Sequence, residues 1–78
     1  MDKHALIKTA DELEFAIFCI ENVATALHTD GQTVYRALNE SNILTDYIVP
    51  SYDVLHTQGK GYIVNDIIDV IKERNVVL

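Results

Sequence analysis

The chain has 78 residues, which is enough for one domain with a thin core. An apolar fraction of 49% argues against disorder, and a single cysteine, Cys19, excludes an internal disulfide framework and fits a reducing cytoplasm. Six basic residues stand against twelve acidic ones, for a net charge of −6, which disfavours nucleic acid and anionic lipid as partners and suits a basic protein.

The first predicted element is a helix from about Ala10 to His28. It follows a capping-box pattern, T-A-D-E, at Thr9 to Glu12. The wheel places Phe18 in the middle of the polar face and Phe15 at its edge, whereas Cys19 lies on an apolar flank as a small buried residue. The predicted buried stripe has one member every three to four positions: Leu13, Ala16, Ile17, Ile20, Val23, Ala24 and Leu27.

A second helix is predicted from about Gly31 to Glu40, with Asp30 as its N-cap. The Ser41-Asn42 turn follows it. Ile43 and Leu44 then have the character of a buried connector.

A third helix is predicted from about Asp46 to His56, with Thr45 as a candidate cap. Pro50 lies beyond the first turn, where a proline removes a hydrogen bond. The sequence therefore predicts either a kink at Pro50 or an irregular first turn.

The fourth helix is predicted from about Gly61 to Arg74, because its apolar residues follow a 3.6-residue period and lack the strict alternation of a strand. An apolar tail, Val76 to Leu78, must either dock or stay exposed. The predicted fold is all-α, a compact four-helix domain with short loops that spans residues 1–78, with residues 9–75 as the folded core. Six residues are expected to be nearly buried: Ile17, Ile20, Leu38, Leu55, Ile67 and Ile71.

The densest polar cluster is Tyr52 to Gly59, in which Asp53 could orient His56 as a general base. Three residues is, however, an ordinary spacing for neighbours on a helix. We favour a structural corner, in which His56 caps the third helix and Thr57 or Gln58 caps the fourth. Gly59 is then expected to end the third helix with a positive φ.

Other chemistry has little support in the sequence. His4, His28 and His56 lack zinc-site spacing, and the glycines around Lys60 are too few for a phosphate loop. We therefore expect no enzyme, no catalytic residue, no cofactor and no metal. No stretch has the length of a membrane span, and Met1 to Lys8 lacks the apolar run of a secretion signal, so a cytoplasmic location is expected.

Four blocks of the chain carry a resemblance to a known family: F-x-I-F-C-I-E-N, V-Y-R-A-L-N-E-S, Y-D-V-L-H-T-Q-G and Y-I-V-N-D-I. From about Glu12 to Arg74 the chain resembles a family of short bacterial helical proteins of unknown function. Tyr52 to Gly59 is the most specific part, and Pro50 is a departure. The resemblance implies a gene often found beside that of an ADP-ribosyltransferase-like protein, and hence a toxin–antitoxin or similar pair. It transfers no catalytic residue.

The leading hypothesis is a protein-interaction module that binds such a partner, itself as a homo-oligomer, or both. The candidate interaction residues are Phe15, Phe18, Tyr52, Asp53, His56 and Gln58. Phe18 needs a cover, for which the alternatives are the C-terminal tail and a second chain, and we favour the second chain. One alternative function is a helix-turn-helix-like DNA-binding regulator, although its expected recognition helix carries no lysine or arginine. The other is a small enzyme that uses His56 and Asp53.

Overall fold

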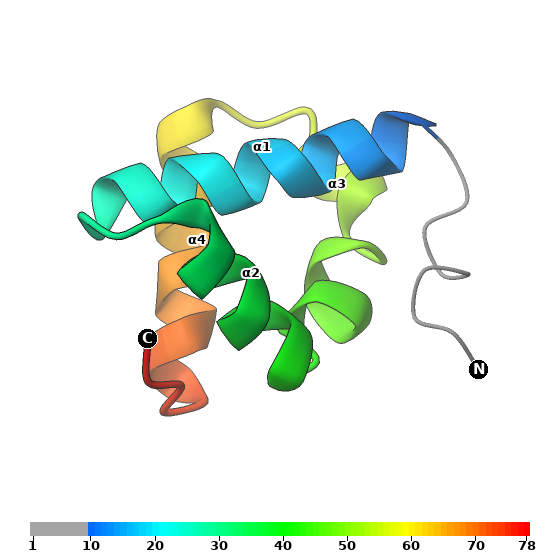
Figure 1. Cartoon of the computed structure of the whole chain (residues 1–78). Helices are drawn as coiled ribbons and strands as arrows, with labels where there is room; N and C mark the ends of the chain where they lie inside the picture. The colour runs from blue at the N-terminus through cyan, green and yellow to red at the C-terminus, as the bar shows by residue number, and fades with distance from the viewer. Residues whose placement is uncertain (1–9) are drawn as a thin grey trace.

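In the computed structural model, which describes residues 10–78, three long helices form the body of the domain and two short segments join the second to the last. The elements are α1 (Ala10–Ala26), α2 (Gly31–Glu40), η2 (Leu44–Ile48), α3 (Tyr52–Leu55) and α4 (Lys60–Glu73). α1 packs against α2 and α4, and α2 packs against η2. Figure 1 shows α1 lying across one side of the molecule, with α2 and α4 running away from it. The described range contains no strand, so the predicted all-α class is confirmed.

The start of α2 follows its sequence. The Asp30 carboxylate accepts a hydrogen bond from the Thr33 backbone N–H at 2.7 Å, as expected of an N-cap. This hydrogen bond holds the pKa of Asp30 below its ordinary value. The capping box predicted for α1 depends on Thr9, which lies outside the described residues.

All three long helices are followed by a residue with a left-handed backbone, which after α2 is Asn42 with φ 64°. α1 ends at Ala26 rather than His28, and His28 has φ 56°. The N–H of Thr29 then reaches back to the Ala24 carbonyl at 3.0 Å, which closes a Schellman-type end. Asn75, with φ 54°, closes α4 in the same way. At the ends of α1 and α4, a residue other than glycine occupies the position where glycine is usual. The sequence therefore did not indicate where these two helices end.

The predicted third helix is broken into two segments. η2 is a π-helix, in which the N–H of Val49 reaches the Leu44 carbonyl, and α3 begins only at Tyr52. Pro50 lies between them and has no N–H. In a regular α-helix its ring would clash with the carbonyl four residues earlier, and the wider π turn relieves that clash. Thr45 lies inside η2, so its predicted capping role is wrong.

A polar contact ties η2 to α4. The Tyr47 hydroxyl donates a hydrogen bond to the Asp66 carboxylate. This hydrogen bond, with partial burial and the charge of Asp66, raises the pKa of Tyr47 to about 12. The connector that precedes Tyr47 is buried as expected, because Ile43 and Leu44 are 0% and 4% exposed.

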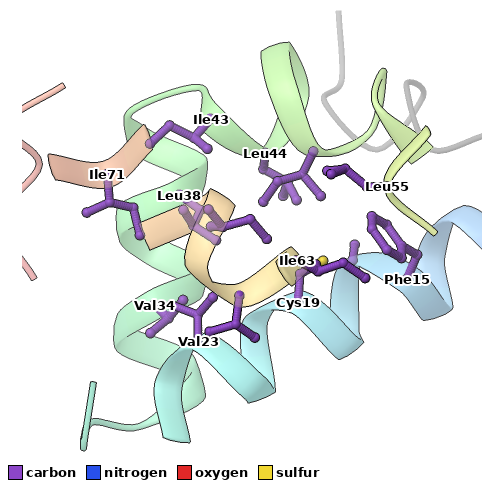
Figure 2. Close-up of a cluster of buried hydrophobic side chains, with 14 of the residues drawn as sticks. Phe15, Cys19, Val23, Val34, Leu38, Ile43, Leu44, Leu55, Ile63 and Ile71 are labelled. Atoms are coloured by element: carbon purple, nitrogen blue, oxygen red, sulfur yellow. The ribbon is translucent and has the colours of Figure 1, made fainter. Parts of the chain in front are cut away.

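The core fills the space between the three long helices and the two short segments. Figure 2 shows side chains of α1, α2 and α4 meeting those of η2 and α3. Four of the six residues expected to be nearly buried are buried: Leu38, Leu55, Ile67 and Ile71. Val76 of the tail packs against the core, whereas Val77 is exposed.

The predicted face of α1 is right in part, because Ala16, Val23 and Ala24 are buried as expected, but its other members are not. Ile17, expected in the core, is 45% exposed, and Leu13 is 47% exposed, while Ile20 is only partly buried. Phe15 and Cys19 are buried in their place. The cause is the position of α2 and α4, which pack on the Cys19 side of a helix that is apolar around most of its circumference.

Candidate functional site

A surface groove of about 390 Å³ lies where α3 and the following corner meet the N-terminal half of α1. α3 lies beside that end of α1 in Figure 1, and their aromatic side chains are in contact. We call this groove the aromatic groove; eight side chains line it: Asp11, Glu14, Phe15, Phe18, Tyr52, His56, Gln58 and Ile63.

Five of the six candidate interaction residues therefore meet at one place. Phe15, Phe18, Tyr52, His56 and Gln58 all line the aromatic groove. The sixth, Asp53, is exposed and is not among the lining residues. The prediction missed Asp11, Glu14 and Ile63. A signal for the first two was present, since they lie three or four positions from Phe15 and Phe18 on the same helix.

Four rings form a continuous row in the aromatic groove. Phe15 and Phe18 stack with centroids 6.5 Å apart, and Tyr52 meets Phe15 edge to face at 5.4 Å. His56 lies parallel to Tyr52, with centroids 4.4 Å apart and an interplanar angle of 8°. These are favoured geometries for aromatic pairs, so each ring holds its neighbour in place.

Helical spacing accounts for this row. Phe15 and Phe18 are three residues apart on α1, and Tyr52 and His56 are four apart on α3 and its C-cap. The Nδ1 atom of His56 lies 2.5 Å from the Tyr52 carbonyl oxygen, which fixes the ring at the end of α3. The predicted structural role of His56 at this helix end is therefore confirmed.

The corner between α3 and α4 differs from the prediction in its details. Gly59 has φ −70° and ψ 158°, an ordinary extended conformation, and it is the N-cap of α4. A positive φ at Gly59 was therefore a wrong prediction, and so was capping of α4 by Thr57 or Gln58. The Thr57 hydroxyl instead donates to the Val54 carbonyl at 2.8 Å. Because Gly59 enters α4 from an extended backbone, the corner needs no left-handed residue.

The aromatic groove has an acidic edge. Asp11 and Glu14 line it, and its lining residues, all within the described range, include no lysine and no arginine. Partial burial raises the pKa of Tyr52, and the nearby carboxylates, Asp11 and Asp53 foremost, raise it further. The negative field of these carboxylates therefore extends to the aromatic row.

Phe18 is neither fully exposed nor core. It is partly buried and packs against the core cluster, while one side lines the aromatic groove. The C-terminal tail does not cover it, because Val77 and Leu78 line a separate pocket beside α2 with Thr33 and Arg36. That a second chain covers Phe18 stays a prediction.

Cys19 is fully buried, as predicted, and burial raises its pKa to about 12. The thiol is therefore neutral and unreactive in the folded state. Among residues 10–78, no three or more His, Cys, Asp and Glu side chains are grouped so that they could hold a metal ion. Within the same range, no helix has the length and apolar character needed to cross a membrane.

Comparison with known proteins gives one match. Residues 14–74 match the family described as protein of unknown function, DUF3791. Neither the curated proteins nor the solved structures include a match to the chain. The matched stretch contains all of the aromatic groove except Asp11. The chain belongs to the DUF3791 family of proteins of unknown function.

Proposed function

We propose that this chain is a cytoplasmic protein-interaction module and that the aromatic groove is its binding surface. The observation that carries the proposal is the row of four rings, of which Phe18, Tyr52 and His56 remain accessible. Aromatic side chains are enriched at the centres of protein interfaces because they bury a large area at little cost in conformational entropy. A domain this small gains from having such rings covered.

The partner that we propose is an ADP-ribosyltransferase-like protein encoded beside this chain. The family resemblance supports this choice, and its most specific part is the Y-D-V-L-H-T-Q-G block at Tyr52 to Gly59. A net charge of −6 also suits a neutralising partner, because an acidic domain is attracted to the basic cleft of a nucleotide-binding enzyme. In this role the chain is antitoxin-like or an accessory subunit.

Self-association is a second use of the same surface. In a symmetric dimer, Phe18 of one copy would pack against Phe18 of the other. Burial of the two rings would favour the dimer. The same arrangement would bring Asp11 and Glu14 of both copies close together, and like charges in contact cost energy. A basic partner is therefore favoured over a second copy.

The test is co-expression of the chain with the neighbouring gene product, followed by co-purification with wild-type protein and with Phe18→Asp. We expect the pair to co-purify and Phe18→Asp to abolish the complex while far-UV circular dichroism of the free domain stays helical. Tyr62→Asp is the matched control, because Tyr62 is an aromatic residue that is 60% exposed and lies outside the aromatic groove. Loss of the complex in both variants, or in neither, would contradict the proposal.

A further inference from the structure

The aromatic groove combines two features. The first is the row of rings from Phe18 to His56, of which Phe18, Tyr52 and His56 are partly or largely accessible to a ligand. The second is a pair of carboxylates, Asp11 and Glu14, beside those rings. Rings alone would suit an apolar side chain, but carboxylates at the same place would lose their hydration to no benefit if an apolar group covered them.

A cation satisfies both features at once. The faces of aromatic rings attract positive charge, and a carboxylate next to the rings adds a direct ionic partner. Among residues 10–78, the side chains that line the groove include no lysine and no arginine. A binding partner can supply such a cation.

Among protein cations, arginine fits better than lysine. Its guanidinium is planar and stacks on rings such as the parallel Tyr52–His56 pair. Its edge carries donors that can bind a carboxylate at two points, while lysine offers a compact and strongly hydrated charge. Gln58 adds an amide oxygen that can accept from the same guanidinium.

We infer that the aromatic groove binds an arginine side chain of the partner protein, with the guanidinium stacked on the aromatic row and paired with Asp11 or Glu14. This inference rests on the proposed function, since it names the chemistry by which that surface recognises its partner. The partner segment is then basic, with at least one exposed arginine.

The experiment uses a probe that does not depend on the partner. Arginine blocked at both ends, as the N-acetyl methylamide, is titrated into the full-length ¹⁵N-labelled protein, and blocked citrulline is the uncharged control of the same shape. We expect amide shifts centred on Asp11, Phe18 and His56. Arginine should bind about two- to fivefold more tightly than citrulline, the factor that corresponds to an exposed cation–π contact. Equal binding of the two probes, or shifts elsewhere on the domain, would overturn the inference.

Two matched pairs of variants sharpen the test. Glu14→Gln and Glu21→Gln make the same change of charge on exposed residues of α1, but only Glu14 lines the groove. Phe18→Leu and Tyr62→Leu each remove one ring and keep an apolar side chain. The groove variant of each pair should weaken arginine binding and the other should not. Equal effects within a pair would show that the probe senses net charge or general apolar surface.

The outcomes separate the two proposals. If arginine binds at the groove and the neighbouring gene product does not co-purify, the choice of partner is wrong and the arginine site stands. If the pair co-purifies through Phe18 and blocked arginine does not bind, the interface stands and the arginine site is wrong.

Discussion

The two halves of α1 are buried to different degrees. In the C-terminal half, Cys19 and Val23 are fully buried, and α2 and α4 pack along that part of the molecule. In the N-terminal half, Phe15 and Ala16 are buried as well, but Leu13 and Ile17 are nearly half exposed. The nearest cover for its aromatic residues is α3, which is only four residues long. A short helix covers little surface, so the end of α1 beside α3 keeps apolar area available for another molecule.

The largest effect is expected in the core cluster that contains both the C-terminal half of α1 and Leu38 of α2. Leu38→Ala removes a fully buried side chain and should lower the free energy of unfolding by about 2–5 kcal/mol. Leu13→Ala makes the same chemical change at the open end, and should cost less than about 1 kcal/mol because that side chain is largely in solvent. Urea unfolding followed by far-UV circular dichroism measures both. Equal losses would remove the distinction between the two ends.

A smaller effect is expected where η2 is tied to α4. Tyr47→Phe removes the hydrogen bond to Asp66 and keeps the ring, so the free energy of unfolding should fall by roughly 1–2 kcal/mol. Tyr62→Phe is the control, because Tyr62 is 60% exposed. A loss in the control as large as that in Tyr47→Phe would show that the hydrogen bond adds no stability.

The same hydrogen bond predicts a dependence on pH. The pKa of Tyr47 in the folded protein, about 12, lies above the ordinary tyrosine value of about 10. Stability from this shift is fully present below about pH 10 and is lost as the pH rises through about 12. The wild type should therefore lose more stability than Tyr47→Phe over this range. Parallel loss in the two proteins would contradict the assignment.

The smallest effect concerns the corner that leads into α4. Gly59 is an N-cap without a capping side chain, and a Cβ there would meet no atom within 4 Å. Gly59→Ser should therefore raise the free energy of unfolding by about 0.2–0.5 kcal/mol through a new cap. Gly59→Ala, which adds a Cβ but no hydroxyl, should not give this gain. Destabilisation by serine would instead favour the positive φ that the sequence predicted for Gly59.

Helix positions were predictable wherever a local signal was strong. α2 has the predicted bounds, because Asp30 caps it and a turn follows it. α4 differs by one residue at each end, since its apolar period defines one face. The third helix was predictable only in part. Pro50 indicated an irregularity. A π turn, however, depends on how the backbone relaxes around the proline, and the period of the apolar residues does not describe that relaxation.

The face of α1 could be predicted only in part from its sequence. Eleven of its seventeen residues are apolar, so several stripes fit the wheel about equally well. The choice among them is made by α2 and α4, which pack beside Cys19 and leave Ile17 in solvent. The clustering of Tyr52, His56 and Gln58 was easier to predict than this face, because the three residues are close together in the sequence. For this cluster to meet Phe15 and Phe18, α3 had only to lie near α1.

The buried thiol of Cys19 gives this domain a built-in chemical probe of its own opening. The chain has one cysteine, and a labelling reagent can reach its sulfur only when α1 separates from the rest of the core. The labelling rate therefore reports the fraction of time that the domain spends opened, as amide exchange does for backbone groups. A ligand that binds only the closed domain lowers that fraction by mass action. Cys19 lies one turn of helix from Phe15, which lines the aromatic groove. The rate at which Cys19 is modified would thus report how much of the groove is occupied, without any label on the ligand.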